Sequence, residues 1–131
     1  MNVIAILAAA AAGFVMGAVW YMTLAGFWLR ALDIELDEKG KPKMEGSYAP
    51  FVVSAIVMLI VATMMQHILT SSGVEGAGAS LVAGLGIGAF LITPWVAMNY
   101  AYAMRKVMLT VIDCGYAILG CGVIGLVLGL F

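Results

Sequence analysis

Four long apolar runs, separated by short polar segments, dominate the pattern of this chain. They cover residues 2–29, 48–69, 77–103 and 107–131. Each run exceeds the roughly 20 residues that a helix needs to cross the hydrocarbon layer of a membrane. Period-two alternation, the mark of a barrel strand, is absent, and backbone polar groups in lipid must be bonded within their own segment. The pattern therefore predicts four transmembrane helices in a single domain, residues 1–131.

Composition indicates the same class of protein. Hydrophobic residues make up 65% and charged residues 10% of the 131 positions, and the mean hydropathy is +1.13. A soluble domain of this size buries too little surface to hide so large an apolar share. The first run has the length of a secretory signal, but no lysine or arginine precedes it, so we treat it as a membrane helix. We expect an all-α integral membrane protein folded as an antiparallel bundle.

The basic residues are confined to two of the connecting segments. One segment extends from Arg30 to Lys43, and the other contains Arg105 and Lys106. With four spans these two segments lie on the same side, and short loops rich in lysine and arginine face the cytoplasm. We therefore expect a multi-pass protein of the bacterial cytoplasmic (inner) membrane with both termini outside. The alternating charges of residues 33–45 indicate a solvated hairpin rather than a polybasic lipid anchor.

Small residues recur at every fourth position along three of the runs, a pattern that lets helix backbones approach closely in lipid. They are Gly13 and Gly17 in the first run, Ser80, Gly84 and Gly88 in the third, and Ala117, Cys121, Gly125 and Gly129 in the fourth. We expect the third and fourth helices to form the tightest seam. Such stripes also serve contacts between subunits, so a homo-oligomer or a place in a larger membrane complex stays open.

Asp113 is the only acidic residue inside a predicted span. It lies about 9 Å along the fourth helix, where an ionised carboxylate is expensive unless it is neutralised, paired or wetted. Asn99 has a similar depth on the third helix, and Tyr116 follows Asp113 by one turn. We predict a polar cluster of these residues, and the full candidate set for a ligand or an ion is Asp113, Asn99, Tyr116, Trp95 and Tyr102.

Two interpretations of this cluster stay open. In one, Asp113 handles a proton or a cation or accepts a ligand. In the other, it is a hydrogen-bonded clip between the third and fourth helices. Pro94 should free the carbonyl of Phe90, which indicates a kink or a cavity, although Thr93 is placed to bond a loose carbonyl. His67 is expected to be a wetted residue at the membrane surface rather than a metal ligand.

Several short motifs resemble a family of small bacterial four-helix membrane proteins, the domain of unknown function family 1761. They are Val19-Trp20-Tyr21, Phe27 to Leu32, Asn99-Tyr100 and Ile112 to Tyr116. The resemblance covers nearly the whole chain and implies a fold without an established activity. Asp113 stands where the family pattern has asparagine, and Pro94 is not part of that pattern. The asparagine form suits a structural hydrogen bond, whereas the aspartate makes a variant function a candidate.

No catalytic set, metal-ligand cluster or phosphate-binding glycine loop occurs in the sequence, so we expect no enzyme, no metal and no cofactor. The expected partners are the lipid bilayer and further copies or a larger membrane complex, and no nucleic acid. One function class is a structural or accessory subunit or a self-assembling bundle. The alternative is a small transporter or channel for a proton, a cation or a hydrophobic molecule that uses Asp113. A third option is pigment, quinone or lipid binding between Trp20, Trp28 and Trp95.

Overall fold

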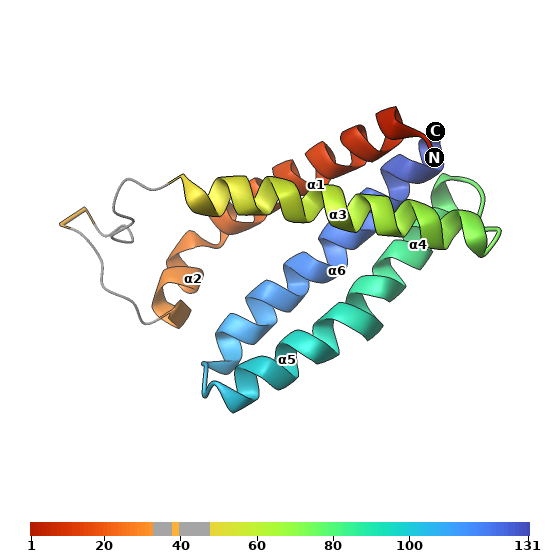
Figure 1. Ribbon diagram of the computed structural model, residues 1–131. Helices are drawn as coiled ribbons and strands as arrows, with labels where there is room; N and C mark the ends of the chain where they lie inside the picture. The colour runs from red at the N-terminus through yellow and green to blue at the C-terminus, as the bar shows by residue number, and fades with distance from the viewer. Residues whose placement is uncertain (33–37, 40–47) are drawn as a thin grey trace.

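The computed structural model describes residues 1–32, 38–39 and 48–131. Within them the chain is helical and contains no strand, which confirms the all-α prediction. Its elements are α1 (Val3–Thr23), α2 (Ala25–Leu32), α3 (Ala49–Ser71), α4 (Ala77–Ile87), a stretch of π-helix η1 (Gly88–Ile92), α5 (Thr93–Tyr102) and α6 (Val107–Leu130) (Figure 1). The hairpin predicted for residues 33–45 lies largely outside the described residues.

Four helical stretches in the described part of the chain are long and apolar enough to cross a membrane. They are Val3–Thr23, Ala49–Ser71, Ala77–Tyr102 and Val107–Leu130. Figure 1 shows that consecutive spans run in opposite directions and that the two termini lie side by side at one end of the bundle. We call this the terminal end. The opposite end carries Arg30, Arg105 and Lys106, and we call it the cationic end.

Helix α6 lies at the centre of the bundle, because it packs most extensively on α4 and α1. About 44% of its most apolar stretch is buried, compared with 17% for α3 and 11% for the span formed by α4, η1 and α5. The core gathers alanines of α1, Met65 and Leu69 of α3, and Cys121 and Ile124 of α6. The two outer spans therefore have few fully buried side chains.

The seam between α4 and α6 joins the two backbones directly. A methyl group added to Gly84 would collide with the carbonyl oxygen of Cys121, and one added to Gly125 would collide with that of Ser80. At Gly88 such a methyl would lie 2.6 Å from the carbonyl oxygen of Ala117. Gly129 faces the Ser80 side chain in the same way. The small residues of the third and fourth runs thus meet along one continuous line, which is where the close packing of membrane helices requires them.

The first span differs from its prediction, because the helix expected over residues 2–29 is broken at Leu24. Helix α1 ends at Thr23, and α2 continues in a new direction to Leu32 (Figure 1). Helix α2 is amphipathic: Ala31 is buried, Phe27 is exposed, and the Arg30 guanidinium lies 5.0 Å from the centre of the Phe27 ring. Such a helix favours the membrane surface. Hydropathy alone does not register this change of direction, since both segments are apolar.

Pro94 perturbs the third span in a specific way. Its missing N–H would leave a regular helix with an unpaired carbonyl one turn earlier. The chain forms the wider turn η1, which ends two residues before Pro94, and the Thr93 N–H donates to the carbonyl of Gly88, five residues back. A π-turn inserts one extra residue into the helix and so rotates everything after it. The hydrogen bond predicted from the Thr93 hydroxyl to an unpaired carbonyl is not formed. The hydroxyl oxygen has no hydrogen-bond partner among the described residues.

Helix α3 packs through only part of its length. At the terminal end its Gln66 side chain accepts from the Asn2 N–H at 3.1 Å and donates to the Asn2 carbonyl at 3.3 Å. Ala62, Met65 and Leu69 are buried in the core. By contrast, residues 50–57 are exposed on every side, and α3 makes no contact with α5. The two helices therefore diverge toward the cationic end, as Figure 1 shows.

Candidate functional site

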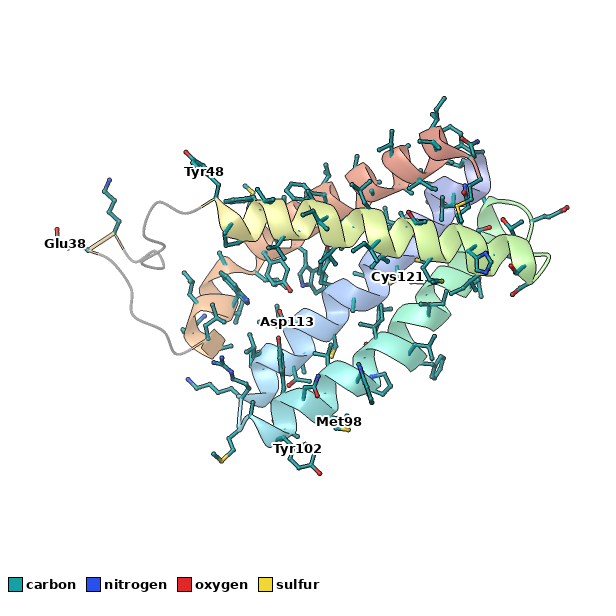
Figure 2. All side chains as sticks on the ribbon, viewed as in Figure 1. Glu38, Tyr48, Met98, Tyr102, Asp113 and Cys121 are labelled. Carbon is teal, nitrogen blue, oxygen red and sulfur yellow. The ribbon has the colours of Figure 1, made fainter. Side chains whose placement is uncertain are left out.

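The carboxylate of Asp113 joins three of the four spans. The Tyr21 hydroxyl, from α1, donates to Oδ1 at 2.6 Å, and the Tyr100 hydroxyl, from α5, donates to Oδ2 at 2.6 Å. Asp113 lies in the half of α6 that belongs to the cationic end (Figure 2). All three side chains are partly exposed rather than sealed in the core. We call Tyr21, Tyr100 and Asp113 the Asp113 cluster.

No cationic side chain among the described residues bonds to Asp113. The two nearest cations in sequence are directed to the end of α2: Lys106 Nζ donates to the carbonyl of Arg30 at 3.0 Å, and the Arg105 guanidinium reaches that of Leu32 at 3.5 Å. Hydroxyl donors strengthen when their acceptor is ionised, but they do not cancel its charge. Among the described residues, the charge of this carboxylate is therefore offset by hydrogen bonds alone and not by a paired cation.

Trp20, Trp28 and Tyr116, which we call the aromatic shell, pack beside the Asp113 cluster at Tyr21 and Ile112. The Tyr21 ring packs edge-on against Trp28 at 5.4 Å and against Tyr116 at 5.5 Å between ring centres. The Trp20 indole N–H donates to the carbonyl of Ile112 at 2.9 Å, immediately before Asp113 in the chain. Such rings present apolar bodies with polar tips, which suits the edge of a membrane core.

Glycines create the room that this aromatic shell occupies. A methyl group added to Gly115 would lie 2.6 Å from the Trp20 ring, and one added to Gly17 would lie 2.8 Å from the Tyr116 hydroxyl. Tyr116 in turn donates to the carbonyl of Gly13 at 2.9 Å. Gly13 and Gly17, which we predicted as helix-packing positions, thus face side chains of other helices rather than a neighbouring backbone.

The partners predicted for Asp113 were wrong. Asn99 is exposed and makes no hydrogen bond to the carboxylate, and Tyr116 bonds to Gly13 instead. Trp95 and Tyr102 point away from the bundle, with 68% and 86% of their surface exposed. The physical reason is the π-turn, since one additional residue rotates α5 by roughly 100° relative to a regular helix. Tyr100 then faces α6 in place of its neighbour Asn99.

Tyr21 is the functional candidate that the sequence analysis missed. It lies two residues before the end of α1, at the same depth as Asp113. A search for polar side chains of equal depth on all four spans would have found it, because antiparallel helices bring such positions together. Our prediction paired Asp113 only with residues of the third and fourth helices, which are close in sequence.

A second polar region lies at the terminal end. His67 is exposed there and lines a cavity of about 450 Å³ together with Gln66, Glu75 and Ser80. The residues that the structure describes contain no group of three histidine, cysteine, aspartate or glutamate side chains that could hold a metal ion. Neither this region nor the Asp113 cluster therefore offers a full ligand set for a structural or catalytic metal.

Four apolar spans and one carboxylate set among them define a small polytopic α-helical membrane protein. Residues 4–129 match the family model described as "Protein of unknown function (DUF1761)", so the chain belongs to that family. This confirms the resemblance drawn from the Trp-Tyr and Asp-Cys-Gly-Tyr motifs. Comparison with curated proteins and with solved structures finds no match.

Proposed function

We propose that the protein is a non-enzymatic subunit of the bacterial cytoplasmic membrane, which assembles with further copies through helix faces that the described residues leave uncovered. Both termini lie outside in this proposal, because Arg30, Arg105 and Lys106 gather at the opposite end and cationic ends face the cytoplasm. The supporting feature is the low buried share of the two outer spans.

One observation carries the proposal. Helix α3 buries Ala62, Met65 and Leu69 but leaves residues 50–57 exposed on every side. Apolar contact alone drives little association in lipid, so an uncovered helix gains from a partner by close packing rather than by burial. A second copy presents the same uncovered helix, and a twofold pairing of the two would cover both.

Cysteine cross-linking in lipid nanodiscs tests this assembly. Val53→Cys, at a position 58% exposed, is expected to form a disulfide between copies, in a background with Cys114→Ala and Cys121→Ala. Met65→Cys is the matched control on the same helix, because Met65 is only 2% exposed. A monomer by native mass spectrometry, together with no cross-link at position 53, would refute self-assembly. Copurification of a different membrane chain would make the protein an accessory subunit instead.

A second candidate function is a small carrier or channel for a proton, a cation or a hydrophobic molecule. The observation that favours it is the Asp113 carboxylate, which two hydroxyls bond and no cation among the described residues neutralises. Reconstituted liposomes should then show pH-dependent flux that Asp113→Ala abolishes. If Asp113→Asn retains the flux, carboxylate chemistry is not required and this candidate fails in its present form.

A further inference from the structure

We propose that the Asp113 cluster and its aromatic shell form a binding site for a lipophilic organic monocation, such as an apolar amine or a quaternary ammonium compound, which reaches it through the lipid. The inference deepens the second candidate function by naming its ligand class. It concerns binding, so it is tested separately from transport.

Charge is the first argument for this ligand class. The two hydrogen bonds at 2.6 Å satisfy Oδ1 and Oδ2 of Asp113 without supplying a positive charge. A hard metal cation needs six or more oxygen ligands, or a cluster of several acidic and imidazole groups, and no such group occurs in the described residues. An organic cation requires only a negative charge and polarisable surroundings, which the cluster provides.

The aromatic shell is the second argument. Tyr21, Trp28 and Tyr116 form a continuous set of edge-to-face rings, with centres 5.4 and 5.5 Å apart. The electron-rich faces of such rings attract cations, and aromatic cages recognise quaternary ammonium groups in this way. The indole of Trp20 lies over Gly115 and is held by its bond to the Ile112 carbonyl, so a further ring packs on this part of α6. A carboxylate bonded to the first of these rings, Tyr21, is complementary to a positive, weakly hydrated group.

The route to the site is the third argument. Arg30, Arg105 and Lys106 lie at the cationic end, between the cluster and the aqueous phase, and they oppose the approach of a small hydrated cation from that side. Toward the lipid, residues 50–57 of α3 stand clear of α5, and the three cluster residues remain partly exposed. A ligand whose apolar part dissolves in the bilayer avoids the positive end.

A pair of probes with the same shape and opposite charge tests the proposal. The wild-type protein in phosphatidylcholine nanodiscs is titrated by equilibrium dialysis with tetraphenylphosphonium and, separately, with tetraphenylborate. We expect saturable binding of the cation and only non-saturable lipid partition of the anion. Equal behaviour of the two probes would overturn the proposal, because it would show partition into lipid and apolar surface alone.

Variants then assign the binding to named residues. Asp113→Asn should weaken tetraphenylphosphonium binding at least tenfold, and Trp28→Leu should weaken it severalfold. Trp95→Leu is the control, since that ring is 68% exposed and outside the shell. Unchanged affinity in Asp113→Asn would overturn the proposal. If that variant does not fold, Trp28→Leu replaces it as the decisive variant, and unchanged affinity there is the contrary result. Saturable binding without flux in liposomes would leave the site intact and remove the carrier function.

Discussion

The two halves of α6 are held to their neighbours by different means. Toward the terminal end, Gly125 and the Cys121 carbonyl lie directly against Ser80 and Gly84 of α4. Toward the cationic end, Asp113 and the Ile112 carbonyl receive hydrogen bonds from Tyr21, Tyr100 and Trp20. Lipid tails are as apolar as leucine, so helices in a membrane associate through close packing or through hydrogen bonds. This protein uses close packing at one end of the helix and hydrogen bonds at the other.

This difference sets how each half responds to change. Backbone packed on backbone has no freedom to adjust, since neither carbonyl can rotate away. Side chains that are held by hydrogen bonds can change their torsion angles. The half of α6 that carries these bonds is also partly exposed. The terminal half therefore acts as the rigid part of the bundle, while the cationic half contains the chemistry.

The largest effect is expected from a single methyl group in the seam. Gly84→Ala places its methyl group against the carbonyl of Cys121. We expect this to lower the free energy of unfolding by about 3 kcal/mol, the upper end of the range for overpacking. Gly86→Ala is the matched control on the same helix, because nothing lies within 4 Å of a methyl group there. Thermal loss of helicity in detergent measures both. Similar transitions for the two variants would show that the seam is looser than described.

Removal of the Asp113 carboxylate is expected to have the second-largest effect on stability. Asp113→Ala leaves the hydroxyls of Tyr21 and Tyr100 without their acceptor and should cost about 1–2 kcal/mol. Asp113→Asn keeps one acceptor oxygen and should retain most of the stability. The same unfolding assay compares them. If Asp113→Ala is as stable as the wild-type protein, the cluster does not hold the three spans together.

A smaller effect is expected for the indole beside the cluster. Trp20→Phe removes the hydrogen bond to the Ile112 carbonyl and part of the ring that lies on Gly115, which should cost about 1 kcal/mol. Trp95→Phe should change little, since that ring is 68% exposed. Equal losses in the two variants would contradict the distinction between shell and surface tryptophans. Unfolding in detergent again provides the measurement.

The smallest effect should come from one hydroxyl of the cluster. Tyr100→Phe deletes a single donor to Asp113 and is expected to cost about 0.6 kcal/mol, the average for a hydrogen bond between membrane helices. Tyr102→Phe, 86% exposed and two residues away, should be neutral. A larger loss of stability in Tyr102→Phe than in Tyr100→Phe would indicate that Tyr102, rather than Tyr100, faces α6. The π-turn would then be absent.

Much of the architecture follows from the sequence, because it depends on local and one-dimensional properties. The lengths of the apolar runs predict the four spans, and they end within a few residues of the helices of the structure except at Leu24. The spacing of Gly84, Gly88 and Gly125 predicts the seam, since smooth faces in lipid serve close packing. Asp113 can also be singled out from the sequence, because it is the only acidic residue within the four apolar runs.

Tertiary structure alone decides which side chains meet at Asp113. Tyr21 lies 92 positions away in the chain, and no periodicity connects the two. The choice of Tyr100 over Asn99 depends on one extra residue in a turn of helix, which rotates α5 without changing its composition. The sequence determines how deep each group lies in the bilayer, because depth is counted along a helix. Which groups face each other is determined by rotation about the helix axes, and packing sets that rotation only once all four spans are in place.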